Sequence, residues 1–253
     1  MKWLLKIVKF GLILGIVGAF AAAAALAAAY YYLEPDLPDI NNLRDVRLQV
    51  PLKVYSSDDK LIAEFGEKRR NPLTYDQIPD RMIQAFLSAE DTNFFEHPGV
   101  DYRGLLRAGV QLALTGKKKQ GGSTITMQVA RNFYLSSQKT YTRKLSEIFL
   151  ALRIEKELSK PEILELYLNK IYLGQRAYGV GAAARVYYGK PVGELNLAQT
   201  AMIAGLPKAP SSFNPLANPP RAVERRNYVL GRMLELGYIT RAEHDSADRK
   251  SVV

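Results

Sequence analysis

The sequence contains no cysteine and only two histidines, His97 and His244. Without cysteine the chain forms no disulfide bonds and offers no thiolate to a metal, so the redox state of its compartment stays open. The two histidines are far apart in the sequence and give no support to a histidine metal site. Hydrophobic residues make up 47% of the 253 residues, which excludes a disordered chain and suits one domain with a sizeable core.

Acidic residues are in the minority. The chain has 35 Lys and Arg residues against 25 Asp and Glu residues, which gives a formal net charge of +10. A basic surface attracts anions in general, whether these are phosphates, lipid head groups or nucleic acid. The charge by itself does not choose among these partners.

One long run without any charge, from Phe10 to Leu33, lies near the N-terminus. As a helix it is long enough to cross a bilayer core of roughly 30 Å. Three lysines precede the run and three tyrosines, residues 30–32, lie at its far end. This arrangement predicts a membrane anchor whose N-terminus is cytoplasmic, with the following domain outside. A cleaved signal peptide is the alternative, because residues 21–29 offer small-residue cleavage sites, but the run is longer than the usual apolar region of about 7–15 residues.

The rest of the chain is predicted to be mainly α-helical, with one small β element. Apolar and polar residues alternate over residues 52–65, which is typical of a hairpin. Later apolar residues have helical spacing, and helices are expected to begin at Asp80 as the cap, at residue 101, at Ser123 or Thr124, at a Ser159–Glu162 capping box, and at residue 221. The expected divisions are a tail (1–9), an anchor (10–33), a connector with the hairpin (34–66), the main domain (67–240) and the start of a truncated linker or further segment (241–253).

Two adjacent carboxylates, Glu90 and Asp91, come at the end of the first of these helices. They are followed by Phe94 and Phe95, and aromatic neighbours can raise the pKa of a carboxyl group towards that of a useful general base. For such a pair alone, a solvated helix end is the better interpretation. His97 is predicted to hold the following turn rather than to transfer protons.

A second stretch, GGSTITMQVARN over residues 121–132, places two glycines before Ser123 and Thr124 at a helix start. Exposed backbone N–H groups at such a start form an anion site, although glycines before a capped helix are also common. A Walker A loop is excluded, because no lysine follows at the required position. Gln128 and Arg131 lie three residues apart and are expected on one helix face.

A third stretch, residues 143–155, has the pattern of an amphipathic helix. Its apolar stripe is expected to face the core and consists of Leu145, Ile148, Phe149 and Leu152. Arg143, Lys144 and Glu147 are expected on the opposite, solvated side, so that removing their charges hardly affects the core. As a structural feature, an Arg–Glu pair at this spacing stabilises a helix by only about 0.3–0.5 kcal/mol.

In order and spacing, these stretches resemble the glycosyltransferase module (glycosyltransferase family 51) of the class A penicillin-binding proteins, most closely of the 1a type. The family's first three motifs are matched by ED with the following F, H and G, by GGSTITMQ, and by RK with a glutamate at Glu147. EILELYLNKIYLG and AGLPKAPSSFNP resemble the fourth and fifth motifs. Arg131 stands where some members have lysine, and no transpeptidase domain follows, which puts bifunctionality in doubt.

The resemblance implies a lysozyme-like helical fold with a membrane-dipping lobe, in the bacterial inner membrane. It also implies polymerisation of a lipid-linked disaccharide-peptide precursor, lipid II, into glycan strands with inversion at the anomeric carbon. Glu90 is then the general base, and Glu147 orients the cations on the diphosphate or holds a divalent metal, Mg²⁺ or Mn²⁺. The implied substrate contacts are Asp91, Phe94, His97, Ser123, Thr124, Gln128, Arg131, Asn132, Arg143, Lys144 and Lys208.

The same resemblance implies partners and cofactors. The partners are the precursor, the growing glycan strand, the membrane and other cell-wall synthesis proteins, and no organic cofactor is implied. Two other functions stay open: a lysozyme-like glycoside hydrolase with a lone glutamate acid, and a non-catalytic cell-wall scaffold or nucleic-acid binder. The cationic helix favours a diphosphate donor over the hydrolase, and a domain outside the cytoplasm rarely meets nucleic acid.

Overall fold

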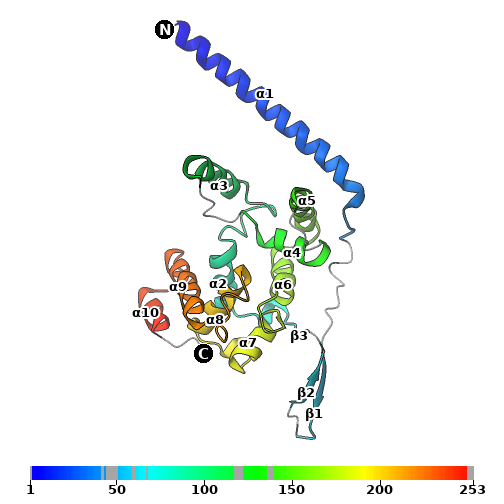
Figure 1. The fold of residues 1–253 in the computed structure, drawn as a ribbon, viewed down its shortest axis with the longest axis vertical. Helices are drawn as coiled ribbons and strands as arrows, with labels where there is room; N and C mark the ends of the chain where they lie inside the picture. Colours follow the sequence, from blue (N-terminus) through cyan, green and yellow to red (C-terminus); the bar gives the residue numbers. More distant parts are fainter. Residues whose placement is uncertain are drawn as a thin grey trace.

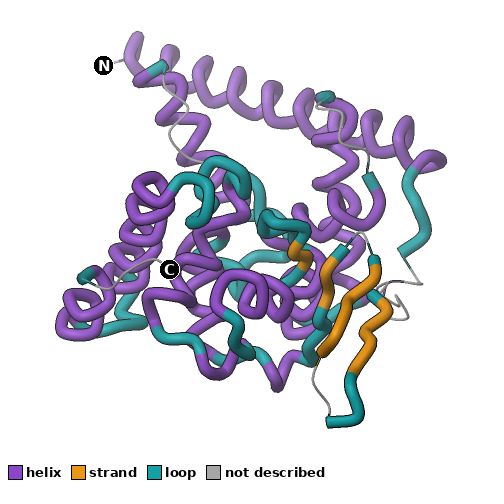
Figure 2. Tube along the Cα trace, turned by 60° about the horizontal axis from the view of Figure 1, so that its bottom comes forward, coloured by secondary structure: helices purple, strands orange, loops and turns teal. Residues whose placement is uncertain are grey.

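The computed structural model describes residues 2–40, 43, 51–58, 61–66, 68–116, 122–135 and 140–249. Helices form the bulk of the molecule, and the strands are confined to one side of it (Figures 1 and 2). This agrees with the expected mainly α-helical class. Residues 41–42, 44–50 and 59–60 of the predicted connector with its hairpin, and residues 117–121 before the second motif, fall outside the described residues.

The N-terminal helix α1 (Lys2–Leu33) extends above the helical domain (Figure 1). Residues Lys9–Asp36 are long and apolar enough to cross a membrane, judged by length and composition alone. The end of α1 contacts α5 (Tyr141–Glu157), where the ring centroids of Tyr30 and Phe149 lie 5.2 Å apart. Arg153 reinforces this contact by donating a hydrogen bond of 2.8 Å to the Tyr30 hydroxyl.

The strands form two small sheets. β1 (Leu52–Tyr55) pairs antiparallel with β2 (Leu61–Phe65), which confirms the predicted hairpin. β3 (Arg69–Arg70) pairs in parallel with β4 (Ala177–Tyr178). The sequence did not predict this second sheet, because strands of two residues carry no recognisable alternation.

Helices of one to five turns make up the domain. Besides α1 and α5, the described α-helices are α2 (Asp80–Glu90), α3 (Tyr102–Thr115), α4 (Ile125–Tyr134), α6 (Lys160–Lys170), α7 (Val180–Tyr188), α8 (Leu197–Gly205), α9 (Pro219–Glu235) and α10 (Arg241–Asp248). Short 3₁₀ turns are η1 (Glu34–Asp36), η3 (Tyr75–Gln77), η4 (Val192–Glu194) and η5 (Leu206–Lys208).

The capping residues agree with the predictions at two of these helices and differ at a third. Thr124 caps α4 by accepting a hydrogen bond from the backbone N–H of Met127. Ser159 and the following glutamate form the predicted capping box of α6. At α2, however, the cap is Pro79, and Asp80 is already the first helical residue. The proline holds an extended conformation immediately before the helix, and the acid in the first turn complements the helix dipole instead.

Helix α2 lies at the centre of the domain. It packs against α8 and α9, while α4 packs against α5 and α6. Phe86 of α2 is fully buried and meets the ring of Tyr167 of α6 edge-on, with centroids 6.0 Å apart. This core brings the C-terminal end of α2 close to the beginning of α4.

The orientation of α5 differs from the prediction. Of its expected core stripe only Phe149 is buried, and Leu152 is 37% exposed. The buried face instead contains Glu147, Leu150 and Ile154, with exposed fractions of 1%, 0% and 0%. The prediction was wrong because α4 and α6 pack on the face that carries the acid, and an apolar stripe by itself does not tell which neighbour covers it.

The C-terminal helix α10 packs on α9 and α8. Arg226 of α9 is almost completely buried and donates a hydrogen bond of 2.8 Å to the carbonyl of Asp248. The expected boundary at residue 240 therefore lies inside a packed unit that continues through α10.

Candidate active site

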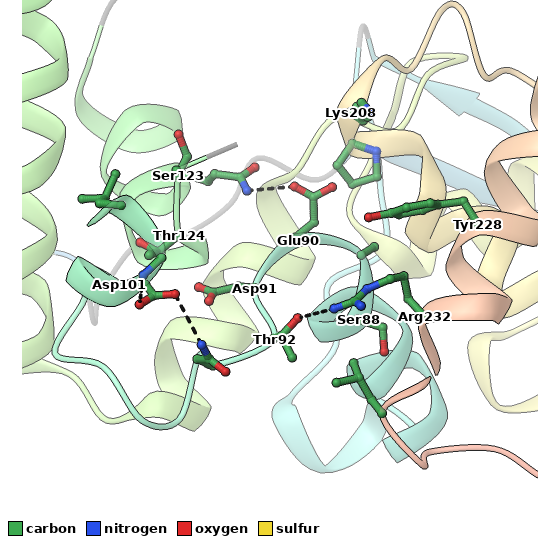
Figure 3. A pocket seen from close by; sticks show the side chains of 18 of the residues that line it. Ser88, Glu90, Asp91, Thr92, Asp101, Ser123, Thr124, Lys208, Tyr228 and Arg232 are labelled. Atoms are coloured by element: carbon green, nitrogen blue, oxygen red, sulfur yellow. Dashed lines mark hydrogen bonds between the residues drawn. The ribbon is translucent and has the colours of Figure 1, made fainter. Parts of the chain in front are cut away.

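A cleft of about 760 Å³ opens where the end of α2, the start of α4, η5 and α9 meet (Figure 3). This volume lies within the range of about 300–1,000 Å³ that is usual for ligand-binding pockets. The residues of functional interest that line it are Glu90, Asp91, Ser123, Thr124, Gln128, Arg131, Lys208, Arg225, Tyr228 and Arg232. The first seven are predicted site residues, and the structure brings them together from three separate motifs.

Glu90 lies in the centre of this cleft, with Lys208 and Tyr228 on one side and Ser123 and Thr124 on the other (Figure 3). Only 14% of its side chain is exposed. Its Oε2 accepts a hydrogen bond of 3.0 Å from Nε2 of Gln128.

Burial raises the pKa of the Glu90 carboxyl above its ordinary value. The hydrogen bond from Gln128 and the charges of Arg225, Arg131 and Lys208 act in the opposite direction and lower this pKa. The net direction is upward. Glu90 is therefore a carboxylate of increased basicity that faces several cations, as a general base beside an anionic leaving group requires.

Arg225 is a site residue that the sequence analysis missed. One of its terminal nitrogens lies 3.7 Å from Oε1 of Glu90, and its side chain is 7% exposed. Its Nε donates a hydrogen bond of 3.2 Å to the carbonyl of Gly205, and its guanidinium lies 4.5 Å from the ring centroid of Tyr228. A Cβ atom at Gly205 would lie 2.9 Å from Cγ of Arg225, so glycine is needed there.

The spacing of polar residues along α9 indicates which face of this helix lines the cleft. Arg225, Tyr228 and Arg232 are separated by three and four residues, which places them on one side of a helix. Arg232 donates a hydrogen bond of 3.2 Å to Oγ1 of Thr92, at the exit of α2. From the sequence, α9 was expected only as a helix beginning at residue 221, without a site residue.

Asp91 and His97 form a buried pair behind the cleft. Nε2 of His97 lies 3.0 and 3.1 Å from the two carboxylate oxygens of Asp91. Nδ1 of His97 accepts a hydrogen bond of 3.2 Å from the backbone N–H of Gly99, which identifies Nε2 as the protonated nitrogen. Phe94 is fully buried beside His97. The expected substrate contacts of Phe94 and His97 are therefore corrected: both side chains hold the turn and lie inside the domain.

The start of α4 differs from the expected anion site. Oδ2 of Asp91 accepts a hydrogen bond of 2.8 Å from the N–H of Ile125, and Oγ1 of Thr124 accepts one of 3.2 Å from that of Met127. Two of the helix-start N–H groups are thus already satisfied within the protein. Ser123 keeps its side chain at the cleft, whereas the preceding Gly121 lies outside the described residues.

Glu147 is held by two cations at the edge of the cleft. Its side chain is only 2% exposed, and it lies 3.2 Å from Nε of Arg143 and 2.9 Å from Nζ of Lys144. Lys144 also donates a hydrogen bond of 2.7 Å to Oγ of Ser123, which lines the cleft. Lys144 thereby connects the third motif to the site. Lys144 itself, Arg143, Glu147 and the half-buried Asn132 are not among the described residues that line it.

Among the described residues, no group of three or more His, Asp and Glu side chains is placed to hold a metal ion. Both carboxylate oxygens of Glu147 face cations. Within the part of the chain that the structure describes, no set of carboxylates and histidines joins Glu147 to give the several ligands that Mg²⁺ or Mn²⁺ needs.

Comparison with known proteins gives one consistent result. The family model described as transglycosylase matches residues 58–234. Penicillin-binding protein 1A of Escherichia coli (strain K12) is 55% identical over 248 residues, which are 98% of this chain and 29% of that protein. Penicillin-binding protein 1A of Pseudomonas aeruginosa is 58% identical over 223 residues, 88% of this chain and 27% of that protein.

A solved structure is also similar to this chain. The crystal structure of penicillin-binding protein 1A from Haemophilus influenzae is 36% identical, with a TM-score of 0.48, over 82% of this chain and 21% of that one. The chain spans less than a third of the length of these curated relatives and of the solved chain.

Proposed function

The chain belongs to the transglycosylase family, and we propose that it is a peptidoglycan glycosyltransferase that polymerises a lipid-linked disaccharide-peptide precursor, lipid II. The observation that carries this proposal is the pairing of a buried carboxylate, Glu90, with the cations Arg131, Lys208 and Arg225 in one cleft. Glycosyl transfer from a diphosphate-linked donor needs both a base and positive charge at the leaving group.

In the proposed reaction, Glu90 takes the proton from the 4-hydroxyl of the acceptor sugar. The resulting oxygen nucleophile attacks the anomeric carbon of the donor, and the bond from that carbon to the diphosphate oxygen breaks with inversion. The lipid diphosphate leaves with the bonding electron pair, next to Arg131 and Lys144. Cations placed where negative charge develops lower the barrier.

Glu147 has an orienting role in this proposal. It fixes Arg143 and Lys144 on one helix face, and Lys144 reaches the cleft edge at Ser123. Mg²⁺ or Mn²⁺ fits better as a counter-ion that arrives with the substrate diphosphate than as a resident ion of Glu147. No organic cofactor enters the scheme.

Incubation with the lipid-linked precursor tests the proposal directly. Formation of glycan polymer is the expected result. Release of short glycan fragments from preformed strands, with no polymer from the precursor, would instead identify a lysozyme-like hydrolase. A folded protein that does neither would favour the non-catalytic scaffold.

The proposed setting is the inner membrane, with α1 as a single anchor, the N-terminus in the cytoplasm and the cleft outside. α3 supports a second, shallower contact, because it exposes apolar side chains every four residues: Tyr102, Leu106, Val110 and Leu114. The growing glycan strand and other cell-wall synthesis proteins are the proposed partners. Nucleic acid is not expected outside the cytoplasm.

Deletion of residues 1–33 is expected to leave a folded domain that loses most of its membrane association. The described contacts of α1 with the domain are confined to its last turn, around Tyr30, whereas the side chains of residues 9–28 are exposed. Vesicle sedimentation and circular dichroism measure the two effects. Residual binding should fall further when Leu106 and Leu114 are changed to Ser. A shortened and freely soluble protein in intact cells would support the signal-peptide interpretation.

Arg225→Gln is expected to move the acidic limb of the pH profile of kcat/KM to higher pH. Arg225 lowers the pKa of Glu90, so its removal raises that pKa further, and a higher pH is needed to ionise the base. Arg225→Lys should restore part of the wild-type profile, because it keeps the charge. An acidic limb that stays in place in Arg225→Gln would show that this arginine does not set the basicity of Glu90.

A further inference from the structure

A second group of cations lies outside the cleft, around the small sheet of β3 and β4. Arg70 of β3 is 5% exposed, and its Nε is buried without a hydrogen-bond partner. Across the described residues, no ion pair to the Arg70 guanidinium is found either. A buried charge without a partner is strongly disfavoured, so such groups are normally paired. The Nε–H donor of Arg70 is therefore unsatisfied within the described part of the protein.

Two lysines share the surroundings of Arg70. Nζ of Lys68 and Cζ of Arg70 lie 5.6 and 5.2 Å from the ring centroid of Tyr178. Lys170, the last residue of α6, places its Nζ 4.3 Å from the ring centroid of Phe133. Lys68 and Arg70 thus share the Tyr178 ring, whereas Lys170 at the end of α6 lies against the Phe133 ring.

The charges in this group repel one another. Burial lowers the pKa of Lys170, and the charges of Arg70 and Lys68 lower it further. Among the residues that the structure describes, no carboxylate opposes this effect on Lys170, and no salt bridge to an acid includes any of the three. A buried guanidinium with an unsatisfied Nε–H donor and two nearby ammonium groups is the arrangement expected of a site that binds an anion.

We propose that Lys68, Arg70 and Lys170 form a binding site for a small oxyanion, a carboxylate or a phosphate group. The site is separate from the cleft, since none of these residues is among the described residues that line it. The segment that follows β3 is held to the last turn of α6, because the backbone N–H of Leu73 donates a hydrogen bond of 2.9 Å to Oδ1 of Asn169. Two ligands supply such an oxyanion: free phosphate, and a peptide carboxylate of the proposed glycan product. Only the second ligand rests on the proposed function.

Calorimetric titration of the intact chain in detergent tests the site with two probes: inorganic phosphate, and a soluble disaccharide-peptide that lacks the diphosphate. Arg70→Met and Lys170→Met should each weaken binding of the recognised probe at least tenfold. Lys190→Met is the matched control, because Lys190 is exposed two residues after the end of α7 and the same charge is removed. It should bind as the wild type does.

Hydrogen exchange separates this site from the cations of the cleft. The recognised probe should slow exchange in residues 69–73 and 169–173 of the wild type, and this protection should be absent in Arg70→Met. Protection by phosphate identifies the free ion as the ligand, and protection by the disaccharide-peptide identifies the carboxylate. Neither result depends on polymerisation, so inactivity towards the lipid precursor would leave this site standing.

If neither probe slows hydrogen exchange in these segments of a folded wild-type protein, the proposal is overturned. Equal affinity of the wild type, Arg70→Met and Lys170→Met would overturn it as well. Arg70→Met replaces a buried unpaired charge by an apolar side chain of similar length, a change that such sites generally tolerate. If Arg70→Met does not fold, Lys170→Met, at a half-buried position, supplies the same comparison.

Discussion

Glu90→Gln is expected to reduce polymerisation of the lipid-linked precursor by a factor of about 10²–10⁴, the usual effect of losing a general base. The amide keeps the shape of the side chain and still meets Gln128, but it accepts no proton from the acceptor hydroxyl. The rate of polymer formation at saturating precursor measures the effect. Glu194→Gln is the matched control, because Glu194 is exposed and outside the cleft.

The same variant should be at least as stable as the wild type at pH 7. The folded-state pKa of Glu90 is raised, so ionisation of this group opposes folding. The resulting loss of unfolding free energy begins as the pH rises through the unfolded-state pKa of about 4.3 and is complete above the folded-state pKa. Below about pH 4 the variant and the wild type should have equal free energies of unfolding. Full polymerisation by a folded Glu90→Gln protein would remove Glu90 as the base.

Changing Arg143 and Lys144 together to Gln is expected to reduce both stability and activity. Glu147 is 2% exposed on its side chain and faces both cations. Removing its partners leaves a buried charge uncompensated, which costs about 3–5 kcal/mol of unfolding free energy. The amphipathic pattern had predicted almost no change in stability, and the burial of Glu147 overturns that expectation. Urea denaturation measures the loss.

Adding Glu147→Gln to the double variant separates structure from substrate binding. The triple variant contains no unpaired buried charge, so most of the stability should return. Polymerisation should stay low, because each lost charge-assisted hydrogen bond to the diphosphate costs about 1.5–3 kcal/mol, or roughly ten- to a hundredfold per residue. If activity returned together with stability, the cations would serve only to neutralise Glu147, and the diphosphate would bind elsewhere.

Local features of this protein were predictable from the sequence. The uncharged run of α1, the alternation in the hairpin and the capping residues Thr124 and Ser159 all act within a few residues. Hydrogen bonds between neighbours and the burial of one face decide such elements, and a linear pattern records both. The three charged motifs were also recognisable, because a catalytic carboxylate and its cations must have those residue types.

The tertiary structure decided which of these residues meet. Arg225 reaches Glu90 across 135 positions of the chain, because α9 packs against α2 and Gly205 leaves room for its stem. The turn that buries Phe94 and His97, and the face on which α5 buries Glu147, also depend on long-range packing. An apolar stripe indicates that one face of a helix is covered, but it does not indicate which other element covers it. The choice of neighbour therefore buried a glutamate that the sequence pattern places on a solvated face, paired it with two cations, and left Nε of Arg70 buried without a hydrogen-bond partner.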